Sequence, residues 1–186
     1  MPPKVKITKE DIVSAAVGVV REQGAEALGA RQVAAALGCS TQPLFSNFAS
    51  MEELRSAVVA YAYNLCGQYI RQEIERGEYP AYKCSGMAYI RYAKEERELF
   101  KLLYMRDRSD ERIPESDLLN DQMERLVQKN TGLSGDEAKL FQLEMWTCVH
   151  GIASMLATRF IDLEWELVSR LLTDVYQGLR KQYGME

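Results

Sequence analysis

The stretch Gly29-Ala-Arg-Gln-Val-Ala-Ala-Ala-Leu-Gly-Cys-Ser-Thr-Gln-Pro-Leu-Phe-Ser-Asn-Phe48 decides the fold of the N-terminal part of the chain. It predicts a short helix over residues 31–37, a turn at Gly38, and a second short helix through about Phe48. The turn needs a residue that tolerates a positive φ, which glycine adopts without steric cost. The small Ala34 suits the crossing of the two helices. This pattern is typical of a helix-turn-helix, whose second helix enters the DNA major groove.

Polar side chains gather where the second short helix begins. Thr41 and Gln42 both donate and accept hydrogen bonds, as contacts to base edges require. Pro43 is tolerated there because the first helical turn does not use its missing N–H. We expect Ser40 to be the N-cap. Two short helices joined by a glycine also occur in all-α proteins that bind no DNA, so this segment alone leaves both interpretations open.

Helical periodicity continues through the rest of the chain, without strand alternation. Further helices are expected at residues 9–23, 51–76, 81–94, 95–105, 116–130, 135–160 and 163–182, with an exposed connector at 106–117. Three capping boxes mark helix starts, at Thr8–Asp11, Ser50–Glu53 and Ser134–Glu137. Gly24 is expected to end the first helix in the left-handed conformation. The predicted fold is all-α, with a three-helix helix-turn-helix domain in residues 1–50 and a larger helical domain in residues 51–186.

Composition excludes several classes of protein. The 186 residues are 47% hydrophobic, which is too apolar for a disordered chain. No apolar run approaches the roughly 18–20 residues of a membrane span, and no secretory signal precedes the first helix. The four cysteines are scattered, which indicates reduced thiols in a cytoplasmic protein. Net charge is −4, yet residues 1–50 hold five basic and four acidic side chains, so this part is free to approach DNA.

Catalysis and metal binding lack the residues they need. The chain has no HExxH, no glycine-rich phosphate loop and a single histidine, His150. Cys148 and His150 lie two residues apart, so they point to different faces of a helix. No cluster of ligands suits a metal ion. We therefore predict that the protein is not an enzyme and needs no cofactor or metal.

Two separate motifs carry a family resemblance. The first comprises Val33-Ala34, Gly38-Cys39-Ser40, Leu44-Phe45-Ser46-Asn47-Phe48 and Met51-Glu52-Glu53-Leu54. The second is Trp146-Thr-Cys-Val-His150-Gly151, which looks like the W-x-x-x-H-G signature of one group of ligand domains. On these motifs the chain resembles the TetR family of bacterial transcriptional regulators. The resemblance implies a homodimer that binds double-stranded operator DNA and responds to a small molecule, with no membrane partner.

The resemblance also assigns residues to DNA binding. They are Lys6, Arg31, Gln32, Ser40, Thr41, Gln42, Pro43, Phe45 and Asn47. The chain departs from the family where a tyrosine and a lysine usually meet phosphates, because Phe45 and Met51 stand there. Asn47 replaces the usual histidine. Lys4, Lys6, Lys9 and Arg31, or backbone N–H groups at the helix starts near Ser40 and Ser50, are expected to compensate.

Ligand contact and dimerisation are assigned to the larger domain. A tyrosine-rich middle segment predicts a site for an aromatic or lipophilic molecule, with contacts from Tyr61, Leu65, Tyr92, Phe100, Trp146 and His150. Helical stripes in the last two long helices predict a dimer interface of Met145, Val149, Ile152, Leu156, Val168, Leu171 and Val175. Both sets have a plainer interpretation, as the core of a single chain.

The predicted function is that of a repressor released from its operator when a ligand shifts the helix that begins after Ser50. Such a ligand must bind the DNA-free state better than the bound one. The alternative is a TetR-like dimeric module that binds small molecules or proteins and has weak or no DNA binding. The departures at Phe45, Asn47 and Met51 are its support.

Overall fold

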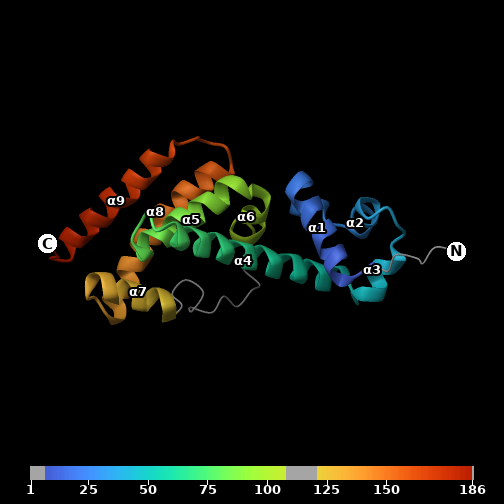
Figure 1. Ribbon diagram of the computed structural model, residues 1–186, viewed down its shortest axis with the longest axis horizontal. Helices are drawn as coiled ribbons and strands as arrows, with labels where there is room; N and C mark the ends of the chain where they lie inside the picture. Colours follow the sequence, from blue (N-terminus) through green and yellow to red (C-terminus); the bar gives the residue numbers. More distant parts are fainter. Residues whose placement is uncertain (1–6, 108–120, 186) are drawn as a thin grey trace. The chain divides into compact units, whose positions relative to one another are not determined.

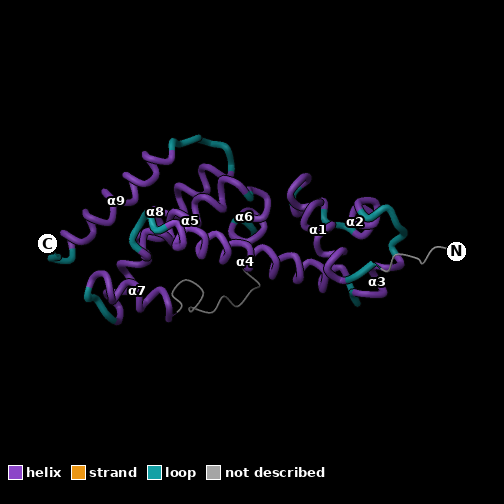
Figure 2. Tube along the Cα trace, in the orientation of Figure 1, coloured by secondary structure: helices purple, strands orange, loops and turns teal. Residues whose placement is uncertain are grey.

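The computed structural model describes residues 7–107 and 121–185, and every regular element in these ranges is helical (Figures 1 and 2). The elements are α1 (Lys9–Gln23), the 3₁₀ turn η1 (Ala25–Ala27), α2 (Ala30–Ala36), α3 (Gln42–Asn47), α4 (Met51–Arg76), α5 (Ala81–Glu95), α6 (Arg97–Tyr104), α7 (Asp121–Thr131), α8 (Gly135–Ala157) and α9 (Trp165–Gln182). The all-α fold class is confirmed. The connector expected at 106–117 lies almost wholly outside the described residues, as does the start of the helix expected at 116.

The chain forms two compact units whose limits cut across the helices. The first unit comprises residues 1–65 and 96–106, so it holds α1 to α3, the first part of α4, and α6. The second comprises residues 66–95 and 107–186. A functional boundary at residue 50 stays a prediction, because compactness alone does not define function.

The first unit is organised around α1. Thr8 and Asp11 form the predicted capping box, with each side chain bonded to the other residue's backbone N–H. The buried face of α1, which includes Ile12 and Ala16, packs against α2, η1 and α6. An ion pair between Arg21 and Glu96, 2.6 Å long, joins α1 to the residue that precedes α6. This ion pair connects α1 to a residue 75 positions further along the chain.

The turn between α2 and α3 is a Schellman motif. Gly38 has φ +64° and donates to Ala35 O, while the Cys39 N–H donates to Ala34 O. These bonds satisfy the carbonyls that a helix end would leave unpaired. The prediction of a glycine turn at this position is confirmed.

Three of the predicted caps differ from the structure. α3 begins at Gln42 after Thr41, so Ser40 lies outside the helix and Thr41 makes no side-chain cap. Ser134 precedes α8 but makes no cap hydrogen bond. Gly24 has a positive φ of 85° but an extended ψ of 168°, so it is not left-handed helical. Cap chemistry depends on how the preceding segment enters the helix, which a four-residue pattern does not specify.

A stripe of buried side chains runs along one face of α4. Its buried side chains include Leu54, Val58, Ala62 and Cys66, whereas Tyr61 is 37% exposed. The stripe ends at Glu73, which is only 1% exposed although it carries a carboxyl group. A charged residue at a buried position was not anticipated, because an apolar-periodicity search passes over it.

The second unit packs α5 against α8 and α9 (Figure 1). A methyl group at Gly86 of α5 would lie 3.2 Å from Val149 Cγ2 and 3.3 Å from Leu172 Cδ1, so glycine permits this close approach. Tyr82 and Phe141 belong to an apolar cluster where α5, α7 and α8 meet. No helix of the described residues is long and apolar enough to cross a membrane.

Most of the stripe predicted as a dimer interface faces the core of its own chain. Five of the seven side chains are at most 8% exposed, namely Met145, Val149, Ile152, Leu156 and Val168. Side chains buried within one chain are not available to a second copy. The plainer interpretation therefore holds for these five. Val175 is half-buried, and Leu171 is 36% exposed.

Candidate nucleic-acid interface and ligand-contact residues

Helix α3 has one buried and one exposed face. Leu44 and Phe48, the residue after the helix, are at most 4% exposed and attach α3 to the first unit. Gln42 and Ser46 are exposed, and the phenyl ring of Phe45 is 52% exposed. Phe45 therefore places an aromatic ring on the exposed face of this short helix.

Two polar side chains of α3 are used within the helix. The Asn47 amide donates to Pro43 O at 2.8 Å, and the Ser46 hydroxyl donates to Gln42 O at 3.0 Å. These bonds keep the Asn47 donor close to the helix axis. At the start of α3, exposed Gln42 and half-buried Thr41 and Pro43 remain available for the predicted DNA contacts. Exposed Ser40 lies just before them.

The basic side chains in and around the helix-turn-helix differ in how available they are to bind DNA phosphates. Arg31 and Gln32 are exposed on α2. Lys9 forms an ion pair with Glu53 at 2.9 Å, and its ammonium lies 4.7 Å from the centre of the Phe48 ring. Lys9 would have to leave Glu53 to neutralise a phosphate. Lys6 and Lys4 lie outside the described residues.

The side chain of Glu53, a residue of the first turn of α4, lies at the N-terminus of that helix. Glu53 accepts from the Ala49 N–H at 2.7 Å, and the Glu53 N–H donates to Ser50 Oγ at 3.2 Å. The hydrogen bond from Lys9, together with that from Ala49, lowers the pKa of Glu53 below 4.5. An ionised carboxylate at this helix start repels a phosphate. The expectation that N–H groups after Ser50 bind phosphate is therefore weakened.

The six predicted ligand residues are divided between the two units. Tyr61, Leu65 and Phe100 belong to the first unit, and Tyr92, Trp146 and His150 to the second. Phe100 and Tyr92 are fully buried. Their rings pack on other aromatic side chains, Phe100 on Tyr104 at 5.1 Å and Tyr92 on Tyr69 at 5.5 Å between ring centres.

Trp146 and His150 are brought together, and Tyr89, a member of the tyrosine-rich middle segment that was not among the six predicted contacts, joins them. The two rings stack at 4.6 Å with an angle of 12° between their planes. Tyr89 Oη lies 2.9 Å from His150 Nδ1, linking α5 to α8. Burial lowers the pKa of His150 below 6.5. The four-residue spacing identified the Trp–His pair, but only packing of α5 adds Tyr89.

Leucines are exposed on the last two helices. Leu140 and Leu143 of α8 are 50% and 46% exposed, and Leu167 and Leu171 of α9 are 44% and 36% exposed. α8 and α9 pack on each other, and glycines 151 and 178 each have open space where a side chain would begin. Four leucines are thus exposed on two helices that pack on each other.

Together these features define a class of protein: an all-α regulator with an N-terminal helix-turn-helix and a larger helical domain. Residues 12–58 match the family model of bacterial regulatory proteins of the tetR family, and residues 84–175 match the tetracyclin repressor-like C-terminal domain. The chain belongs to the TetR family of transcriptional regulators.

Solved structures share this fold at low sequence identity. A TetR-like transcriptional regulator from Rhodococcus sp. RHA1 is 17% identical, with a TM-score of 0.70 over 96% of this chain and 98% of that one. A protein from Pseudomonas aeruginosa PAO1, described as a candidate transcriptional regulator, is 11% identical, with a TM-score of 0.64 over 93% and 90%. No curated protein matches the chain.

Proposed function

We propose that this TetR-family regulator is a homodimeric repressor that leaves its operator when it binds a small lipophilic or aromatic molecule in the cytoplasm. The observation that carries the DNA-binding part is the geometry of α3. Leu44 and Phe48 anchor the helix, while Gln42 and Phe45 project from it. A short helix with its anchor residues inward and polar residues at its start is built to enter a major groove.

The test separates base contacts from phosphate contacts. Binding is measured over a range of salt concentrations, on DNA from immediately upstream of the protein's own coding region and on random DNA of equal length. Q42A should weaken binding to the operator alone, by about 1–3 kcal/mol, because Gln42 is assigned to a base edge. R31A should weaken binding to both DNAs and reduce the salt slope by about one. Equal affinity of the unmodified protein for both DNAs contradicts the proposal.

The dimer is proposed to form through the exposed leucines of α8 and α9, in place of the buried stripe predicted first. One recognition helix reads one half-site, so a dimer is needed to read two half-sites about one helical turn apart. Leu171 is the member of the first prediction that remains in this interface.

Ligand release is proposed to act through the second unit. Trp146 and His150, joined now by Tyr89, remain the proposed aromatic contacts. A ligand shifts the DNA equilibrium only if it binds the DNA-free conformation more tightly. The measurement is DNA affinity with and without each compound of a screen, and a regulator whose affinity no compound changes would not be ligand-responsive.

A second function has a specific observation in its favour. Phe45 lacks a hydroxyl, Lys9 is paired with Glu53, and Glu53 occupies the start of α4, so three phosphate contacts are missing or blocked. These features favour a TetR-like dimeric binding module with weak or no DNA binding. Absence of binding to any DNA at low salt, by a folded dimer, would select this function over the first.

A further inference from the structure

One carboxylate is buried in the second unit, and only one of its oxygens is satisfied. Glu73 Oε2 accepts from Arg76 Nη1 at 2.8 Å and from Arg91 Nε at 3.2 Å. Glu73 Oε1 is buried and has no hydrogen-bond partner among the described residues. Leaving a buried acceptor unsatisfied is unfavourable, and more so when the group is charged. The position therefore calls for an N–H or O–H donor that the described residues do not supply.

A second unsatisfied atom lies by the same arginine. The guanidinium of Arg91 is 4.3 Å from the centre of the Trp165 ring. Trp165 Nε1 is buried, and no acceptor for it exists among the described residues. The acceptor, Glu73 Oε1, belongs to α4, and the donor, Trp165 Nε1, belongs to α9. Arg91, which contacts both side chains, belongs to α5. Three helices thus bring one free acceptor and one free donor to one place.

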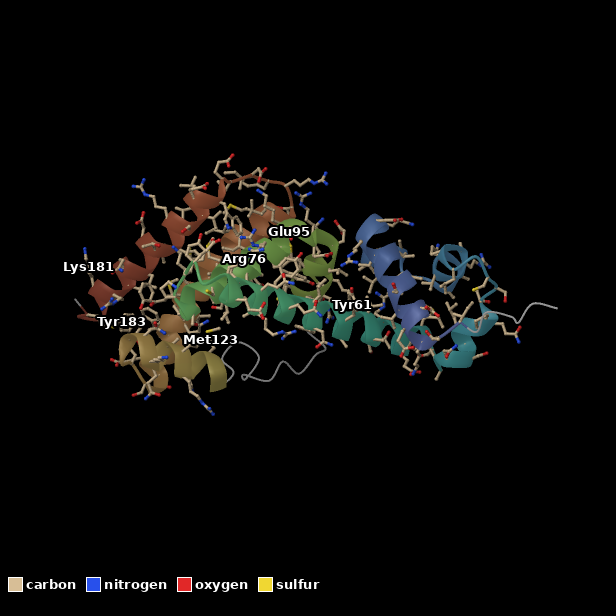
Figure 3. All side chains as sticks on the ribbon, viewed as in Figure 1. Tyr61, Arg76, Glu95, Met123, Lys181 and Tyr183 are labelled. Carbon is tan, nitrogen blue, oxygen red and sulfur yellow. The ribbon has the colours of Figure 1, made fainter. Side chains whose placement is uncertain are left out.

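The charges around these atoms select the ligand. Arg76 and Arg91 are opposed by Glu73 and by Glu95, which lies 4.0 Å from Arg91 and accepts from Tyr69 Oη at 2.8 Å (Figure 3, where Arg76 and Glu95 are labelled). Two positive and two negative groups leave the cluster neutral. An ammonium group would add an unbalanced positive charge beside two arginines, and a carboxylate would be repelled by Glu73. A neutral hydroxyl both donates and accepts without changing the charge.

We propose that Glu73 and Trp165 form the polar end of a binding site for a neutral ligand with a hydroxyl group, an alcohol or a phenol. The ligand O–H donates to Glu73 Oε1, and a ligand oxygen accepts from Trp165 Nε1. Arg91 positions both side chains. The inference rests on the ligand response proposed above and names the chemistry of the ligand that produces it.

The experiment observes Trp165 directly. The chain has two tryptophans, so a nitrogen-15 correlation spectrum contains two indole N–H signals, and W165F assigns them. Benzyl alcohol is the probe, with toluene as the analogue without a donor and benzylamine as the cationic analogue. The Trp165 signal should shift and saturate with benzyl alcohol, at an affinity about tenfold or more above that of either analogue.

Variants test the carboxylate. E73Q should weaken benzyl alcohol binding about tenfold or more, because the charged acceptor is lost. E75Q, at an exposed glutamate two residues along α4, is the matched control and should bind as the unmodified protein does. If E73Q does not fold, the affinities of the three probes for the unmodified protein decide whether the hydroxyl site exists. A Trp165 signal that ignores benzyl alcohol, or that responds equally to toluene, overturns the inference.

DNA binding of the same sample distinguishes this inference from the proposed function. If the protein binds its operator in a salt-dependent way but the Trp165 signal does not shift with benzyl alcohol, only the hydroxyl site is overturned. A responsive Trp165 signal in a protein that binds no DNA supports the site and overturns the repressor.

Discussion

Individual side chains at the surface of α3 are proposed to set the strength of DNA binding. The family resemblance places a phosphate-binding tyrosine where this chain has Phe45, whose ring is 52% exposed. A hydroxyl added to an exposed ring needs no repacking of the core. Adding one oxygen atom to this ring, by replacing Phe45 with tyrosine, should therefore restore the phosphate contact.

F45Y should raise affinity for operator and random DNA alike, by about 0.5–1.5 kcal/mol, because a phosphate contact carries no sequence information. The measurement is the salt-titrated binding assay with both DNAs. F160Y is the matched control, since Phe160 is 81% exposed and lies between α8 and α9. A gain confined to the operator would show that position 45 contacts a base instead.

His150 is the only histidine, so one group accounts for histidine titration. Burial lowers its pKa in the folded state below the ordinary 6.5, so the unfolded chain takes up the proton first. Stability is therefore complete above pH 6.5 and falls as the pH drops from there through the folded pKa. Urea unfolding of the unmodified protein between about pH 5 and 7 should show this loss. H150N, which keeps an acceptor for Tyr89, should not show this loss of stability at low pH. An equal loss in H150N would exclude His150 as the source of the pH dependence.

Pairs of helices are joined by polar contacts as well as by apolar packing. Tyr82 of α5 donates to Gln142 of α8 at 2.8 Å, and both side chains are at most 9% exposed. Burial raises the pKa of Tyr82 far above its ordinary value, so the hydroxyl remains a donor at any physiological pH. The bond helps to fix the position of α5 against α8 because both partners are largely shielded from water.

Y82F should destabilise the protein by about 1–3 kcal/mol, since it leaves the Gln142 oxygen buried without a donor. Y82F/Q142L should recover part of this loss by removing the unpaired group. The free energy of unfolding in urea is the measurement. Y63F is the control, because Tyr63 is 39% exposed, and it should change stability by no more than about 0.5 kcal/mol. Equal effects of Y82F and Y63F would mean that the buried bond contributes nothing.

The whole molecule is proposed to act as a dimer that joins two reading heads. Its interface is assigned to the exposed leucines 140, 143, 167 and 171. These side chains would bury apolar surface on association, which is the main favourable term in stable dimers. A charge introduced there should separate the subunits without unfolding them.

L171E should be monomeric by sedimentation velocity, with an unchanged helical circular dichroism spectrum, and should lose most of its operator affinity because one head reads only one half-site. I74E is the control, since Ile74 of α4 is 49% exposed and lies outside the proposed interface. It should remain dimeric. A dimeric L171E would place the interface elsewhere.

Local features of the sequence determined the helices, the glycine turn at Gly38 and the family, because helical periodicity and turn chemistry act over a few residues. Near Thr8 and Asp11 the pattern also gave the correct cap. The sequence did not determine which apolar stripe faces outward: Met145 and Val149 entered the core while Leu143 and Leu167 remained exposed. That choice depends on packing between helices distant in the chain.

Tertiary structure alone decided the proposed ligand chemistry. Glu73, Arg91 and Trp165 come from three helices, and no spacing in the sequence connects them. The one signal was that position 73 continues the buried stripe of α4, where a carboxylate stands in an apolar pattern. Whether such a group is buried, paired or left with a free oxygen depends on the neighbours that folding brings to it, since the cost of burying a charge is set by its surroundings.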